Sequence, residues 1–207
     1  MQKCYNEIRN ERVVFIVQVL KDELRHKILL EAQHLFLQRG YDRTSLQMIA
    51  DKVNISKSNL YHYFKNKEEL FYELTDGAAE GLKKLILRFK DKRFDPRTGQ
   101  REYQVLLTEE VISLLLAEKY GLLLIMEQSH GTRYEDLRKS MIDMLAAKTA
   151  PLLADEDNSL LLAQIMASNL IDGTVQILKN RIRPREVRMN LNRLVEYHTN
   201  GINALLK

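Results

Sequence analysis

The sequence is poor in the residues that interrupt helices or form crosslinks. Its 207 residues include no Trp, 3 Pro, 8 Gly and 1 Cys. Because Pro and Gly break regular structure, their scarcity favours long helices over short strands joined by turns. The single cysteine, Cys4, excludes an intrachain disulfide and a cysteine-based zinc site. We therefore expect an all-α protein in a reducing, cytoplasmic setting.

Motifs for metal binding and catalysis are also missing. The five histidines are scattered, and no pair has metal-ligand spacing with a carboxylate partner. The nucleophile-elbow, zinc-protease and phosphate-loop patterns do not occur. We expect no metal, no cofactor and no enzymatic activity.

The net charge and the apolar segments of the sequence do not by themselves indicate a function. The formal net charge is +4, which is compatible with nucleic acid, but the net charge alone favours an evenly charged, solvated surface. The apolar run Val13–Leu20 is much shorter than the roughly 20 residues that cross a bilayer. We expect no membrane association. Residues 1–21 are interpreted as an N-terminal extension that packs on the body or pairs with a partner, or as a product of the assigned translation start.

Apolar residues three or four apart predict an amphipathic helix from Glu23 to Arg39. Gly40 stands where a left-handed C-terminal cap belongs. Thr44, with Gln47 three residues later, forms a capping-box pattern that predicts the start of a second helix. We expect this second helix to end near Val53.

A tight turn and two further helices are predicted next. Asn54 tolerates the positive φ that the turn requires. Ser56 caps a predicted helix over 57–64, and Asn66 caps another over 67–89.

A charged segment, residues 90–101, contains Pro96 and Gly99 and predicts a loop that joins two halves of the chain. Beyond it, helices are expected near residues 102–118, 120–129, 133–153, 158–181 and 185–206. Pro184 fits the first turn of the last helix. We divide the chain into an N-terminal extension (1–21), a helix-turn-helix domain (22–75) and a helical domain (76–207).

Residues 44–67 have the pattern of a helix-turn-helix, with two short helices joined by a four-residue turn. A small apolar core is predicted from Ile49, Ala50, Val53, Ile55 and Leu60. Five polar or aromatic residues would then face outward, where a recognition helix meets base edges: Lys57, Ser58, Asn59, Tyr61 and His62. Residues 42–67 hold five basic and two acidic side chains, so the positive charge is concentrated at this face.

At these residues the sequence resembles the tetracycline-repressor (TetR/AcrR-like) family of transcriptional regulators. The resemblance covers roughly residues 24–75 and is carried in register by Ala50, Ser56, Leu60, Tyr61, Tyr63, Phe64 and Lys67. Asn54 stands where the family usually has Gly. Asn59 stands where Thr or another small residue is common, which bears on the bases that are read.

The resemblance implies a set of DNA-binding residues. Thr44 would contact a phosphate through its hydroxyl and backbone amide, with Ser45 beside it. Tyr63 and Lys67 would hold phosphates across the groove, and the five outward residues of the recognition helix would enter the major groove. There, Lys57 would pair with guanine and Asn59 with adenine. Each residue taken alone also has a structural explanation, such as helix capping by Thr44.

The resemblance also implies that the second half binds a ligand and forms a dimer. The predicted interface residues lie on the last two helices: Ile165, Asp172, Val175, Leu191, Leu194, Val195, His198 and Ile202. A purely intrachain core explains the same pattern nearly as well. The Leu- and Met-rich stretch 103–148 suits an apolar pocket or ordinary core packing. The predicted ligand-binding residues are Tyr103, Met126, Gln128, His130, Tyr134, Met141 and Asn169.

Together these features predict a homodimeric, sequence-specific transcriptional regulator. We expect a repressor that is released from a palindromic double-stranded DNA operator by a small apolar or amphipathic effector. The alternative is a helical protein-interaction module that does not bind DNA.

Overall fold

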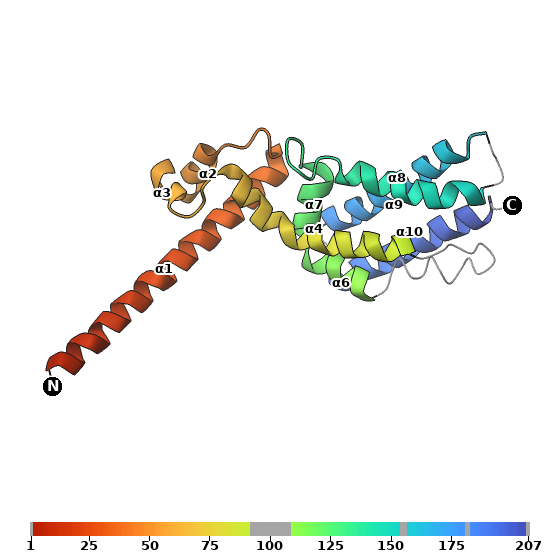
Figure 1. The fold of residues 1–207 in the computed structure, drawn as a ribbon. Coiled ribbons are helices and arrows are strands. Elements are labelled where there is room, and N and C mark those ends of the chain that lie inside the picture. Colours follow the sequence, from red (N-terminus) through yellow and green to blue (C-terminus); the bar gives the residue numbers. More distant parts are fainter. Residues whose placement is uncertain (1, 92–108, 154–156, 181–182, 206–207) are drawn as a thin grey trace. The chain divides into compact units, whose positions relative to one another are not determined.

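A computed structural model describes residues 2–91, 109–153, 157–180 and 183–205 (Figure 1). Every regular element in these ranges is helical, so the prediction of an all-α protein is confirmed. The elements are α1 (Gln2–Arg39), α2 (Leu46–Val53), α3 (Lys57–Tyr61), α4 (Lys67–Asp91), α6 (Glu109–Ala117), α7 (Lys119–Glu127), α8 (Leu137–Thr149), the 3₁₀ turn η3 (Ala150–Leu152), α9 (Ser159–Lys179) and α10 (Pro184–Asn203).

The chain divides into two compact units, Met1–Leu74 and Thr75–Lys207, and the division falls inside α4. The charged segment 90–101, which the sequence indicated as the joint, is therefore not where the units separate. Residues 90 and 91 continue α4, and the rest of that segment lies outside the described residues.

Helix α1 is longer than the helix predicted over residues 23–39, because it continues back to Gln2. No Gly or Pro occurs before Gly40, so nothing in the sequence interrupts the helical hydrogen bonds. Its buried side chains include Ile28, Ala32 and Phe36. Gly40 ends it with a φ of 87°, a left-handed conformation that suits glycine.

The first unit closes around a small core that includes aromatic rings. The ring centroids of Phe36 and Phe71 lie 5.4 Å apart at an edge-to-face angle, and Tyr41 lies 5.0 Å from Phe71. Leu60 and Phe64 are almost fully buried in the same unit. This packing fixes α3 and the segment that follows it.

Local hydrogen bonds set the ends of α2 and α3. Ser45 caps α2 by accepting from the Met48 amide at 3.2 Å, so the predicted cap at Thr44 is wrong by one residue. Asn54 adopts a φ of 64° in the turn, as its position predicted. Ser56 caps α3 by accepting from the Asn59 amide at 3.0 Å.

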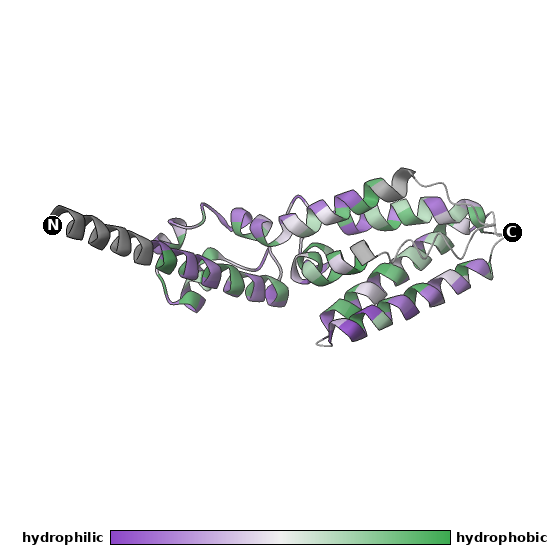
Figure 2. Ribbon diagram, turned by 90° about the horizontal axis from the view of Figure 1, so that it is seen from below, coloured by the Kyte–Doolittle hydropathy of each residue, from purple (hydrophilic) through white to green (hydrophobic). Residues whose placement is uncertain are grey.

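The second unit is a helical bundle in which α9 contacts both α8 and α10 (Figure 1). Its helices carry apolar and polar sides, as the hydropathy colouring in Figure 2 shows. Helix α4 and helix α6 approach closely at Gly81, where an added Cβ would lie only 2.2 Å from a methyl carbon of Leu114. Helix α8 begins at Leu137, four residues later than predicted, because residues 128–136 form a structured loop.

By length and composition alone, α9 would be able to cross a membrane, and it is the one such helix in the part of the chain that the structure describes. One side of α9 contributes Ala163, Ala167 and Ile171 to the core of the second unit. The opposite side exposes Leu161 and Ile165 to solvent.

Candidate nucleic-acid interface and ligand cavity

Helix α3 presents a polar edge to solvent because its apolar residue points inward. Leu60 is fully buried, which leaves the side chains of Lys57, Ser58, Tyr61 and His62 exposed. The fifth predicted reading residue, Asn59, is half-buried. The outward direction of this edge matches the expectation from the sequence, whereas the base contacts stay a prediction.

Two of the predicted reading residues of α3 interact with each other. The ammonium of Lys57 lies 5.9 Å from the centroid of the Tyr61 ring, one helical turn away. Such a cation–π contact at an exposed site is worth about 0.5–1 kcal/mol. It favours one arrangement of the two side chains at the front of the helix.

Thr44 differs from its predicted role at a phosphate. It is 2% exposed, and its hydroxyl donates to the carbonyl oxygens of Gly40 at 2.8 Å and Leu35 at 3.3 Å. Its backbone amide donates to the Tyr41 carbonyl at 3.3 Å. Both donors are therefore used within the domain, and Thr44 ties the loop before α2 to the end of α1. Ser45, beside it, is exposed and caps α2.

Lys67 is held at the loop before α2. Its ammonium donates to the Tyr41 carbonyl at 2.7 Å and lies 4.0 Å from the centroid of the Tyr41 ring. Desolvation of the half-buried ammonium lowers the pKa of Lys67, and the nearby Asp42 partly opposes this change. The phosphate contact of Lys67 stays a prediction, and so does that of Tyr63, which is likewise half-buried. Tyr41 therefore positions Lys67, a role that the sequence analysis did not assign to it.

Exposed basic residues flank α3 within the first unit. Arg43 precedes α2, Lys52 lies near its end, and Lys65 follows α3. These side chains were counted in the sequence as local positive charge but were not assigned contacts. Their exposure leaves them available to neutralise a polyanion.

An apolar cavity of about 130 Å³ lies within the second unit. Helices α4, α6, α7, α8, α9 and α10 all contribute lining residues, among them Leu82, Leu115, Met126, Met141, Ile171 and Leu191. Thr174 is the single polar residue among the described residues that line it, and its hydroxyl donates to the Leu170 carbonyl at 2.8 Å. The described walls therefore suit hydrocarbon and offer no free donor.

The predicted ligand-binding residues have mixed outcomes. Met126 and Met141 line the cavity, and Tyr103 lies outside the described residues. Four predicted residues are absent from the described lining: Gln128, His130, Tyr134 and Asn169. The first three belong to the loop 128–136, which contributes no residue to the described lining and contacts Asp76 of α4 instead. Asn169 is exposed on α9, one residue before the lining begins at Leu170.

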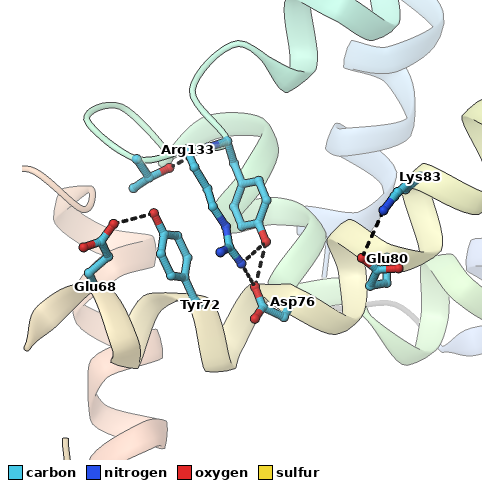
Figure 3. A network of polar contacts seen from close by, with 8 residues as sticks. Glu68, Tyr72, Asp76, Glu80, Lys83 and Arg133 are labelled. Atoms are coloured by element: carbon cyan, nitrogen blue, oxygen red, sulfur yellow. Dashed lines mark hydrogen bonds and ion pairs between the residues drawn. The ribbon is translucent and has the colours of Figure 1, made fainter. Parts of the chain in front are cut away.

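The loop 128–136 is fastened to α4 by polar contacts (Figure 3). Arg133 and the Tyr134 hydroxyl both donate to Asp76, at 2.5 Å and 2.6 Å. His130 is exposed and lies 3.2 Å from the carboxylate of Glu135. Burial raises the pKa of Tyr134, and the hydrogen bond to Asp76 raises it further.

Half of the predicted dimer residues belong instead to the core of their own chain. Val175, Leu191, Val195 and Ile202 are buried, and the first three line the cavity. The burial of these four side chains agrees with the alternative explanation, a purely intrachain core. Leu194 is half-buried with a methyl carbon 2.9 Å from an added Cβ on Gly173.

The other predicted dimer residues are more accessible. Ile165 is 50% exposed, next to Leu161 at 59%, and Tyr197 on α10 is 77% exposed. Asp172 forms an ion pair with Arg138. Burial lowers the pKa of His198. These exposed apolar side chains, which sequence reasoning mostly missed, form the available surface on α9 and α10.

Comparison with known proteins bears on the first unit most directly. Residues 28–74 match the family described as bacterial regulatory proteins, tetR family. Over 89 residues, 42% of this chain, the sequence is 36% identical to the HTH-type transcriptional regulator YuxN of Bacillus subtilis, of which it covers 31%. Over 71 residues, 34% of this chain, it is 34% identical to IcaR of Staphylococcus epidermidis, the HTH-type negative transcriptional regulator of the biofilm operon icaADBC, of which it covers 38%. The match thus spans about a third of each curated relative.

A solved structure extends the likeness in fold to both units. A TetR-like transcriptional regulator from Rhodococcus sp. RHA1 aligns with a TM-score of 0.53 and 18% identity. The alignment covers 86% of this chain and 96% of that one. At this identity the likeness concerns the fold alone.

Proposed function

We propose that this chain is a sequence-specific DNA-binding transcriptional regulator of the TetR family, because residues 28–74 match that family and the relatives that share this region are HTH-type transcriptional regulators. In this proposal it acts in the cytoplasm as a homodimeric repressor, and a small apolar or amphipathic effector releases it from a palindromic operator. The observation that carries the proposal is the exposed polar edge of α3, held outward by the buried Leu60.

The charges around α3 support binding to a duplex. Lys57 lies on the reading edge, and exposed Arg43, Lys52 and Lys65 flank it. Phosphate neutralisation by such side chains supplies sequence-independent affinity, while contacts to base edges supply specificity. In this proposal Lys57 and Tyr61 read bases; both are exposed, and the Lys57 ammonium lies 5.9 Å from the centroid of the Tyr61 ring.

The dimer in this proposal uses the exposed apolar side chains of the last two helices. Leu161 and Ile165 lie one turn apart on α9, and Tyr197 is exposed on α10. A second copy of the chain would cover these side chains with the same surface, as a two-fold interface requires. A dimer of this kind presents two reading helices to half-sites one helical turn apart.

The effector in this proposal occupies the cavity of the second unit. Its described lining is apolar apart from Thr174, and it includes three methionines, Met126, Met141 and Met144, whose flexible side chains adapt to different shapes. An effector that fills this volume would pack against α4, which continues from the first unit.

Selection of bound fragments from a random duplex pool tests the proposal. We expect enrichment of a palindromic sequence, which would demonstrate base reading and two-fold symmetry together. Enrichment of no sequence above the starting pool would overturn the proposal.

A pair of lysine variants then connects binding to α3. Lys57→Ala should weaken binding to the selected duplex by about 1–3 kcal/mol, the value of one good base contact. Lys83→Ala is the matched control, because Lys83 is an exposed lysine of the second unit. Equal losses in both variants would argue against base contact by α3.

A further inference from the structure

A charged pair lies beside residues that line the cavity, where α7 ends and α8 begins. Arg138, the second residue of α8, forms an ion pair with Asp172 of α9. A second nitrogen of the same guanidinium, Nη1, lies 3.5 Å from the carbonyl oxygen of Met126, whose side chain lines the cavity. The pair therefore lies next to a wall whose described lining residues are apolar apart from Thr174.

Helical spacing also directs Arg138 toward the cavity. Met141 and Leu145 follow it by three and seven residues and lie on the same face of α8. Both of these residues line the cavity. Asp172 lies beside the lining residue Ile171 on α9. Arg138 thus continues the line of cavity residues by one further turn, toward the start of α8.

The ion pair of Arg138 and Asp172 can separate without leaving either charge buried and unpaired. The side chains of Arg138 and Asp172 are 37% and 44% exposed, so water reaches both groups. Asp172 also accepts a hydrogen bond from the Ser168 hydroxyl at 3.2 Å, through its other oxygen. An exposed ion pair contributes little net free energy, so exchange of one carboxylate for another at Arg138 is inexpensive.

The cavity accepts the hydrocarbon part of a ligand and leaves a polar group outside. A dry apolar cavity of about 150 Å³ holds benzene, so the volume of about 130 Å³ found here suits a part of roughly six carbon atoms. Burial of a charged headgroup within these walls would cost several kcal/mol, because no described wall residue offers it a partner.

We propose that the cavity binds an amphipathic monocarboxylate, with its hydrocarbon part inside and its carboxylate on the guanidinium of Arg138 in place of Asp172. The inference rests on the proposed function only in taking the cavity as the effector site. Guanidinium is suited to this exchange, because its planar fork binds a carboxylate through two parallel hydrogen bonds.

Three ligands with the same chain and different headgroups test the inference on the full-length protein. Isothermal titration calorimetry would compare octanoate, 1-octanol and octylammonium at concentrations below micelle formation. We expect octanoate to bind at least tenfold more tightly than octylammonium and severalfold more tightly than octanol. Equal affinity for octanoate and octanol, or preference for octylammonium, would overturn the inference.

Two substitutions distinguish a headgroup site from an ion pair that only stabilises the packing of α8 against α9. Arg138→Gln should weaken octanoate about tenfold and change octanol less than twofold. Asp172→Asn should strengthen octanoate severalfold, because the competing carboxylate is gone. Lys139→Gln removes an exposed neighbouring charge and should leave all three affinities unchanged.

If the ion pair only stabilises the packing of α8 against α9, Asp172→Asn should weaken the binding of all three ligands or change none of the three affinities. If Arg138→Gln does not fold by circular dichroism, the direction of change in Asp172→Asn decides the question. Binding of the selected duplex, measured separately by mobility shift, tests the regulator proposal. Loss of headgroup selectivity with intact duplex binding would refute this inference alone.

Discussion

Arg133 donates to the carboxylate of Asp76 at 2.5 Å, although 57 residues separate the two in the sequence (Figure 3). The Tyr134 hydroxyl donates to the same oxygen at 2.6 Å. These two contacts fasten the loop between α7 and α8 to α4 within the second unit. The hydrogen bonds that Arg133 donates to the Tyr134 hydroxyl, at 2.7 Å, and to Asp76 raise the pKa of Arg133, so its guanidinium stays charged.

Removal of this fastening should loosen the loop while the fold persists. In Asp76→Asn, we expect faster amide hydrogen exchange in residues 128–136 and a decrease of less than about 1 kcal/mol in the free energy of unfolding, because the pair is exposed. Glu80→Gln, one turn further along α4, is the matched control. Unchanged exchange in this loop would show that the contact does not hold it.

Lys67 should contribute to DNA binding without reading the bases. In Lys67→Met, we expect weaker binding to all duplexes alike and a shallower dependence of affinity on salt concentration. Because the ammonium also donates to the Tyr41 carbonyl, thermal unfolding must be measured in parallel. A changed base preference with an unaltered salt slope would argue against a phosphate contact.

Two glycines in helices provide a matched test of packing. Gly81→Ala would place a Cβ 2.2 Å from a methyl carbon of Leu114, so we expect a loss of about 1–3 kcal/mol in the free energy of unfolding. At Gly201 an added Cβ meets nothing within 4 Å, so Gly201→Ala should stabilise α10 by about 0.5–1 kcal/mol. Urea unfolding measures both changes. Equal effects would mean that Leu114 moves aside freely.

The exposed apolar side of α9 should control assembly. In Ile165→Glu, a charge would enter the proposed dimer interface, so we expect the dimer to dissociate while helical content is retained. Sedimentation velocity measures the change. Leu87→Glu is the control, since Leu87 is similarly exposed, at 54%, on α4. Dissociation in both variants, or in neither, would contradict an interface at Ile165.

The sequence by itself determined the helix-turn-helix, because the interactions that define it are local. The caps at Ser56 and Asn66, the left-handed turn at Asn54 and the inward position of Leu60 depend on residues a few positions apart. The charge and exposure of α3 follow from the same short pattern. The predicted start of α2 was wrong by one residue, because Thr44 and Ser45 are both residue types that cap helices and the capping-box spacing favoured Thr44.

Tertiary structure alone decided what the apolar face of each helix packs against. An apolar residue on α9 or α10 satisfies a protomer core and a dimer interface equally well, and the spacing of Leu191, Val195 and Ile165 does not distinguish them. The burial of Thr44 depends on α1, and the position of Tyr134 depends on Asp76, 58 residues away. Helical periodicity specifies that a face is apolar, whereas the neighbour of that face is set by contacts between segments distant in the chain.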